Sequence, residues 1–283
     1  MTPLREKMVD AMRMRGFSVR THESYLSAVF KLAKYYRRSP ERLSRDELQA
    51  FFLYLVKERG LSGASCRLYL NGIRFLYLKV LDWPEFDVSL EVPKKAQRIP
   101  ELLTRAEVAA ILAAVVNPKH QTLLYTCYGC GLRVSEVCAL KVRHIDRERH
   151  LLRVEQGKGA KDRMVIIGDT LLQRLRQYWR LYRPSDWLFP GQTPARPLEI
   201  STAQKVFQHA KQRAGIHKVG GIHALRHAYA THQLEAGVAI HQLQHPLGHQ
   251  SLQSTLRYVH WVPNYRERGN AVDLLLALEQ RHD

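Results

Sequence analysis

The sequence lacks the features that would place a protein in a membrane or outside the cell. No run of about 18 apolar residues occurs, so we expect no membrane-spanning helix. Charged residues are scattered from Arg5 to Arg20, which leaves no room for the apolar part of a signal peptide. Only 4 cysteines occur in 283 residues, too few for a disulfide framework. Cys127 and Cys130 have C-x-x-C spacing, but their apolar neighbours favour buried thiols over a redox or metal site. We therefore expect a reducing, cytoplasmic location.

Acidic residues are also scarce. The chain has 26 Asp and Glu against 44 Lys and Arg, a formal net charge of +18. Basic residues are in excess in both halves of the chain, so the charge does not belong to a tail. Such an excess predicts a polyanionic partner, nucleic acid before an anionic membrane. The apolar and charged fractions are those of an ordinary folded protein, and the length allows two domains.

The first domain, residues 1–92, is predicted to be helical throughout. Apolar residues recur at helical spacing in three segments, and Ser44-Arg45-Asp46-Glu47 is a capping-box pattern that begins a further helix. The three segments are residues 3–14, 25–36 and 65–81. Residues 93–101 follow as a basic linker bracketed by prolines, and its Lys94, Lys95 and Arg98 are candidate DNA-binding residues.

The second domain, residues 102–283, is predicted to mix helices with a small sheet. Two short segments, 151–154 and 164–167, show the residue alternation typical of strands and flank a Gly- and Lys-rich turn. This pattern indicates a β-hairpin. The fold class expected for the whole chain is therefore mainly α with a small β-sheet (α+β). The helices expected in this domain are 104–115, 119–128, 134–140, 169–182, 201–214, 223–236, 239–247 and 251–258, and a last apolar segment covers 272–278.

Five side chains of the second domain suit chemistry on a phosphodiester: Arg133, His223, Arg226, His249 and Tyr258. A guanidinium is a planar fork that can hold two phosphate oxygens, and two such forks could neutralise the charge that metal ions neutralise at other phosphoryl-transfer sites. Both arginines lie in apolar surroundings, where an unpaired charge is costly. No carboxylate cluster is evident beside them in the sequence.

The tyrosine needs help to act as a nucleophile, because its ordinary pKa is about 10. His249 and His260 lie near Tyr258 in sequence and are candidates for that help. Lys158 and Lys161, at the tip of the expected hairpin, either protonate a leaving alkoxide or contact DNA phosphates.

A metal site is an alternative use of the histidines. His241, His245 and His249 are spaced four residues apart, a spacing that could align ligands on one helix face. However, Pro246 and Gly248 interrupt that helix, and no carboxylate lies within the stretch.

The motifs together point to a family. They are Arg133 in G-L-R-V-S-E, His223-x-x-Arg226-His, L-G-His249 and Tyr258-x-His, and they occur in this order. This set resembles the tyrosine recombinase (phage integrase) family, in particular its Xer-like and integron-integrase-like bacterial members. The resemblance covers nearly the whole chain. It implies a four-helix, SAM-like core-binding domain followed by a tyrosine recombinase catalytic domain.

The resemblance implies a mechanism for strand exchange. Tyr258 would attack the scissile phosphate and form a 3′-phosphotyrosyl link with a free 5′-hydroxyl. Arg133 and Arg226 would clamp the non-bridging oxygens, and His223 would assist proton transfer from the tyrosine. His249 would hydrogen-bond the phosphate.

The leaving 5′-oxygen would be protonated by Lys158, with Lys161 as the fallback. No ATP, metal or other cofactor would be needed.

The implied partner is double-stranded DNA with specific recombination sites, on which four protomers assemble for integration, excision or resolution. Residues 272–278 would dock on a neighbouring protomer or pack on their own domain. Two departures from the family are visible. Pro246 stands where the family usually has an apolar residue, which predicts a bent or shortened helix before His249. The interval from Lys158 to His223 is too short for the insertion of integron integrases, which favours a Xer-like enzyme.

Three other functions remain open at this point. A non-catalytic DNA-binding protein could keep the same fold, and a type IB topoisomerase would share the chemistry. A metal-dependent nuclease would use the histidines instead.

Overall fold

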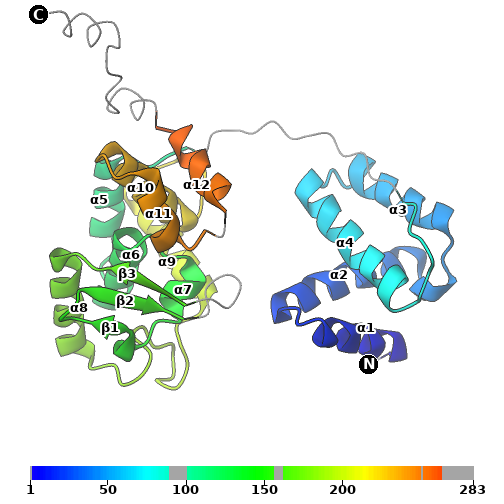
Figure 1. The fold of residues 1–283 in the computed structure, drawn as a ribbon, viewed down its shortest axis with the longest axis horizontal. Helices are drawn as coiled ribbons and strands as arrows, with labels where there is room; N and C mark the ends of the chain where they lie inside the picture. Colours follow the sequence, from blue (N-terminus) through cyan, green and yellow to red (C-terminus); the bar gives the residue numbers. More distant parts are fainter. Residues whose placement is uncertain (1, 89–100, 156–161, 250, 263–283) are drawn as a thin grey trace, which may run out of the picture. The chain divides into compact units, whose positions relative to one another are not determined.

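The structure, a computed structural model, divides the chain into two compact units, Met1–Arg98 and Ile99–Asp283 (Figure 1). It describes residues 2–88, 101–155, 162–249 and 251–262. The predicted fold class is confirmed, because the described residues form helices and one small three-stranded sheet. No helix among them is long and apolar enough to cross a membrane. The basic linker expected at residues 93–101 lies, apart from Glu101, outside the described residues.

The first unit consists of helices that enclose an aromatic-rich core. The capping box predicted at Ser44 forms with both of its hydrogen bonds. One helix begins earlier than predicted, at Val19 rather than Tyr25. Its first turn, residues 19–22, has Val19 as its single apolar residue, so apolar periodicity does not reveal it, and Ser18 caps it. The helices are α1 (Pro3–Met14), α2 (Val19–Tyr36), α3 (Arg45–Lys57) and α4 (Gly63–Lys79), with a 3-10 turn at Pro40–Arg42.

The second unit consists, in its described residues, of eight helices and an antiparallel sheet of order β1-β2-β3. The strands are β1 (Ile145–Asp146), β2 (Leu151–Val154) and β3 (Arg163–Ile166), so the predicted strand pair is confirmed. The two-residue β1 was not predicted, because it is too short to show alternation. The helices are α5 (Arg105–Ala113), α6 (Pro118–Gly129), α7 (Val134–Cys138), α8 (Asp169–Tyr182), α9 (Ile200–Arg213), α10 (His223–Glu235), α11 (Ile240–Leu247) and α12 (Leu252–Val259), all close to their predicted bounds.

Two hydrophobic clusters hold the second unit together. The larger one joins the sheet to helices α5–α10, and the smaller one is built by α10, α11 and α12. Tyr258 belongs to the smaller cluster, so packing among these three helices sets its position.

The cysteines are core residues, as predicted. All four are free and buried. Burial raises the pKa of Cys130 and Cys138 to about 12, so these thiols stay protonated and unreactive at neutral pH.

Candidate active site

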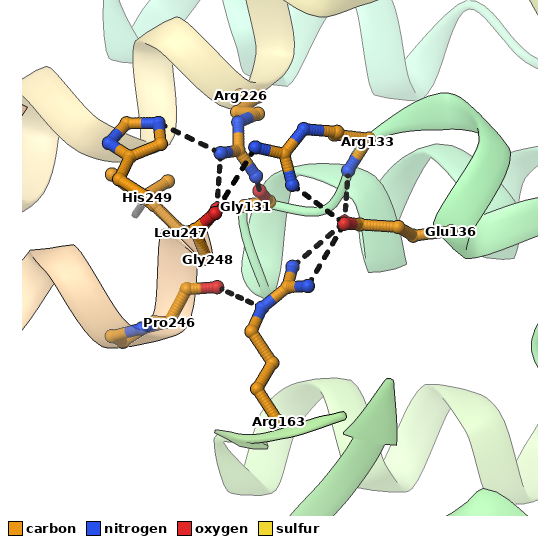
Figure 2. Close-up of polar contacts among 9 residues, drawn as sticks. All are labelled: Gly131, Arg133, Glu136, Arg163, Arg226, Pro246, Leu247, Gly248 and His249. Atoms are coloured by element: carbon orange, nitrogen blue, oxygen red, sulfur yellow. Dashed lines mark hydrogen bonds and ion pairs between the residues drawn. The ribbon is translucent and has the colours of Figure 1, made fainter. Parts of the chain in front are cut away.

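Three arginine side chains from separate elements gather around one buried carboxylate in the second unit (Figure 2). Arg133 lies immediately before α7, Arg163 begins β3, and Arg226 is in α10. The carboxylate is Glu136 of α7, which is 7% exposed. Because three guanidiniums are accompanied by a single carboxylate, this cluster keeps an excess of positive charge that an anion would neutralise.

Glu136 binds two of these arginines at once. Its Oε1 accepts hydrogen bonds from Nη1 of Arg133 and Nη1 of Arg163 at 2.8 and 2.9 Å. Its Oε2 accepts from Nη2 of Arg163 and from the backbone N–H of Arg133, both at 2.8 Å. Burial acts to raise the pKa of Glu136, but the hydrogen bonds from Arg163 and Arg133 outweigh it and lower that pKa to about 2. The sequence showed no carboxylate cluster beside the arginines, and the structure adds a single carboxylate partner, Glu136, to Arg133 and Arg163. The first turn of α7 brings Glu136 back onto Arg133 and orients its guanidinium.

Arg226 is almost completely enclosed, with 1% of its surface exposed. Its Nη1 donates to the carbonyl oxygen of Gly131 at 2.8 Å, and its Nη2 donates to the carbonyl oxygen of Leu247. Burial, followed by the charge of Arg133, lowers the pKa of Arg226 to about 10, so the side chain stays protonated at neutral pH. A buried guanidinium held by neutral carbonyl groups keeps its charge available for an anionic ligand.

Two glycines let the backbone approach these arginines. Gly131 has a φ of +60°, and a Cβ at this position would lie 2.4 Å from the ring of Tyr229. Gly248 has a φ of +59°, and a Cβ there would lie 3.0 Å from the guanidinium of Arg163. The carbonyl oxygen of Gly248 accepts a hydrogen bond from Arg133 at 3.4 Å. Because only glycine adopts this φ freely and has no Cβ, these residue types are required here.

His249 reaches the arginines although Pro246 precedes it. Helix α11 runs through Pro246 to Leu247 and ends at Gly248, so the shortening expected from the proline is not observed. The carbonyl oxygen of Pro246 accepts a hydrogen bond from Nε of Arg163 at 2.8 Å, which ties the end of α11 to β3 (Figure 2).

The protonation of His249 follows from its two partners. Its Nε2 lies 3.0 Å from Nη2 of Arg226, and a guanidinium can only donate, so Nε2 accepts. Nδ1 therefore carries the proton and donates to Oγ1 of Thr255 at 2.8 Å. Burial, followed by the charges of Arg226 and Arg133, lowers the pKa of His249 to about 4. The ring is neutral at physiological pH.

Tyr258 of α12 lies beside His249 and Arg226, and its surface is 4% exposed. Its ring stacks on that of His249, with an interplanar angle of 5° and centroids 6.1 Å apart. Its hydroxyl is 3.2 Å from Nδ1 of His227. Burial raises the pKa of Tyr258, although the charge of Arg226 and a hydrogen bond from it act in the opposite direction. The phenol is therefore protonated at neutral pH.

His223 lies at the start of α10 with an exposed side chain. Its ring contacts that of His227 edge-on, with centroids 5.2 Å apart. Desolvation by the surrounding protein, followed by the charges of Arg226 and Arg133, lowers the pKa of His223. The nitrogen that meets the Tyr258 hydroxyl thus belongs to His227, one helical turn after the histidine that was expected to assist the tyrosine.

The structure brings Arg133, His223, Arg226, His249 and Tyr258 into one region of the second unit, as the motifs predict. The structure does not describe the other expected residues. Lys94, Lys95, Arg98, Lys158, Lys161 and the apolar segment 272–278 lie outside the described residues.

The metal-site alternative gains no support from the geometry. Across the described residues, no three His, Cys, Asp or Glu side chains are placed to hold a metal ion together. His249 is bonded to Arg226 and Thr255, whereas His241 and His245 are exposed on α11.

Sequence reasoning gave no role to three members of the site, although two of them stand in the quoted motifs. Glu136 follows Arg133 by three residues and His227 follows His223 by four, so helical spacing could have indicated both. Arg163 carried no such signal, because its partners lie far away along the chain.

Comparison with known proteins agrees with this geometry. The phage integrase family matches residues 101–264, and the phage integrase N-terminal SAM-like domain matches residues 4–85. The integrase/recombinase y4qK of Sinorhizobium fredii is 40% identical over 266 residues, which cover 93% of this chain and 86% of the relative. Tyrosine recombinase XerA of Pyrococcus horikoshii is 31% identical over 256 residues, 89% of this chain and 87% of the relative. The solved structure of the XerH site-specific recombinase bound to a palindromic difH substrate has a similar fold. Its TM-score is 0.72 at 20% identity, over 93% of this chain and 82% of XerH.

Proposed function

This chain belongs to the phage integrase family of tyrosine recombinases, and we propose that it cuts and rejoins duplex DNA at specific sites with Tyr258 as the nucleophile. The observation that carries the proposal is the buried tyrosine hydroxyl beside a cluster of fixed cations. Tyr258 attacks the scissile phosphorus, which leaves a 3′-phosphotyrosyl link and a free 5′-hydroxyl. The 5′-hydroxyl of a partner strand then attacks that link and restores the phosphodiester.

Arg133 and Arg226 hold the non-bridging oxygens during both steps. Their guanidiniums are already fixed by Glu136 and by backbone carbonyl groups, so little reorganisation is needed when negative charge develops. Preorganised donors of this kind typically contribute about 100-fold or more to the rate each.

His249 has a role that depends on a change at Arg226. In the structure its Nε2 accepts a hydrogen bond from Arg226, and while it does so it cannot donate to a phosphate oxygen. When the phosphate takes over the Arg226 guanidinium, Nε2 is released and His249 can donate to the phosphate after its proton relocates. Lys158 is the proposed acid for the leaving 5′-oxygen, with Lys161 as the alternative.

A groove beside the site is suited to the DNA flanking the scissile phosphate. It has a volume of about 750 Å³ and extends from His223 along the exposed face of α9. Gln204, Gln208 and Gln212 line it with amide groups, which can pair with base edges, and Lys205 adds a cation for the backbone. The overall charge of +18 would make binding strongly dependent on salt.

The assembly proposed for the reaction is a homotetramer on two DNA sites. XerH and a lambda integrase dimer were solved bound to their DNA sites, and their folds are similar to this one. The proposed location is the DNA-containing cytoplasm, where the four free thiols of this chain would stay reduced.

The test is a covalent-capture experiment. A duplex recombination site, mapped first by footprinting, carries a nick near the scissile phosphate so that the cleaved strand escapes and the protein–DNA adduct accumulates. The native protein should form the adduct in the presence of a chelator, and Tyr258→Phe should form none while binding DNA normally. Tyr182→Phe, on the exposed outer face of α8, is the matched control and should react like the native protein.

Three outcomes would contradict the proposal. Absence of an adduct with native protein would leave a DNA-binding protein without catalysis. Complete loss of activity in chelator would favour a metal-dependent nuclease. Relaxation of supercoiled DNA without paired sites, and without recombinant products, would favour a topoisomerase.

A further inference from the structure

The hydroxyl of Tyr258 needs a proton acceptor before it can attack phosphorus. The ordinary pKa of a tyrosine is about 10, and burial raises that of Tyr258 further. A neutral phenol is a weak nucleophile, so its proton must leave as the new bond forms. The group that takes it must lie within hydrogen-bonding distance of the hydroxyl.

His227 meets this requirement. Its Nδ1 lies 3.2 Å from the Tyr258 hydroxyl, and the two ring centroids are 5.7 Å apart. The two residues belong to different helices, α10 and α12, and the ring of Trp261 packs edge-on against both of them at 5.6 and 5.2 Å. Helix packing therefore fixes the contact.

The surroundings set the direction of this hydrogen bond. Burial, followed by the neighbouring His223, Arg226 and Arg257, lowers the pKa of His227 to about 4, so its ring is neutral and able to accept. The Arg226 guanidinium can only donate to the Tyr258 oxygen, which leaves the phenolic proton to point toward Nδ1 of His227. A bound phosphodiester would offset the neighbouring cations and raise the affinity of His227 for a proton.

We propose that His227 is the catalytic base that takes the proton of Tyr258 during strand cleavage, an inference that rests on the proposed function. As the bond from the Tyr258 oxygen to phosphorus forms, the phenolic proton passes to Nδ1 of His227. The bond from phosphorus to the 5′-oxygen breaks, and that oxygen receives a proton from the general acid, for which Lys158 is the candidate. In rejoining, the 5′-hydroxyl attacks phosphorus and gives its proton back to the now neutral amine of the general acid, while the His227 imidazolium returns its proton to the departing tyrosine oxygen.

The experiment measures single-turnover adduct formation from pH 6.5 to 9.5 with His227→Asn. Asparagine can hydrogen-bond the hydroxyl but cannot take its proton. The variant therefore distinguishes a His227 that accepts the proton from a His227 that only positions the hydroxyl. Two nicked substrates are compared, one with the natural 5′-oxygen and one with sulfur at the bridging 5′ position. Because a thiolate leaves without protonation, the sulfur substrate isolates the nucleophile's half of the reaction.

With His227→Asn we expect adduct formation about 100-fold slower at pH 7 on both substrates. The deficit should shrink as pH rises, because the variant depends on the tyrosinate fraction, which grows about tenfold per pH unit below the tyrosine pKa. His241→Asn, an exposed histidine on α11, is the matched control and should match the native protein. If the asparagine variant is not folded by circular dichroism, His227→Gln provides the same comparison.

Two results would overturn the inference: a His227 variant within about threefold of native at pH 7, or a deficit that is the same at every pH. The same pH-dependent deficit in His223→Asn, with none at His227, would assign the base to His223 instead. If native protein forms no adduct on either substrate, the proposed function itself fails. If native protein reacts and the His227 variant reacts equally well, only the assignment of the base fails.

Discussion

Replacing Glu136 by glutamine should destabilise the second unit by about 3 kcal/mol at pH 7. The substitution keeps the shape of the side chain but removes the charge that compensates Arg133 and Arg163. The magnitude follows from the pKa of Glu136, which falls from 4.5 to about 2 on folding, at about 1.4 kcal/mol per pKa unit. The side chains of Glu136 and Arg163 are 5% and 6% exposed, so solvent screens this pair little.

The pH dependence of this effect has a definite sign. Because the folded-state pKa of Glu136 lies below the unfolded one, the stabilisation is complete above about pH 4.5 and disappears as pH falls toward about 2. The difference in unfolding free energy between the native protein and Glu136→Gln should therefore be roughly halved at pH 3.

The assay is urea unfolding followed by tryptophan fluorescence. In a Trp83→Phe background the remaining tryptophans all lie in the second unit, so the signal reports that unit alone. Asp186→Asn is the control, since its pair with Lys141 is solvent-exposed on the aspartate side and should contribute less than about 1 kcal/mol. A loss below about 1 kcal/mol for Glu136→Gln, or an equal loss at pH 7 and pH 3, would refute the reasoning.

Two further substitutions test how the site is held. Arg226→Lys should slow adduct formation by about 100-fold and leave DNA affinity nearly unchanged, because a lysine ammonium cannot replace the planar guanidinium. The control is Arg180→Lys on the exposed face of α8, and a similar loss of rate in this variant would contradict the prediction. Gly131→Ala should lower the unfolding free energy of the second unit by more than about 1 kcal/mol, because its φ is left-handed and a Cβ would collide with Tyr229. Gly168→Ala, where a Cβ meets nothing within 4 Å, should lower the urea midpoint less, and equal midpoints for the two glycine variants would count against the argument.

Most elements could be predicted because their signals are local. The capping box at Ser44 forms as expected, since both of its partners lie within one helical turn. The start of α2 was missed because its first turn has a single apolar residue, and β1 was missed because two residues show no alternation of apolar and polar side chains. The shortening considered for Pro246 does not occur, since α11 extends through it to Leu247.

The sequence by itself determined the family: the order of Arg133, Arg226, His249 and Tyr258 resembles the tyrosine recombinase pattern, and the phage integrase family matches residues 101–264. Only the tertiary structure decided which partners these groups have. His227 meets Tyr258 across 31 positions of the chain, and Arg163 meets the carboxylate beside Arg133 across 27. Such contacts depend on how α10 packs against α12 and how β3 lies beside α7. Residue periodicity reports which face of an element is buried, and it does not report which distant element covers that face.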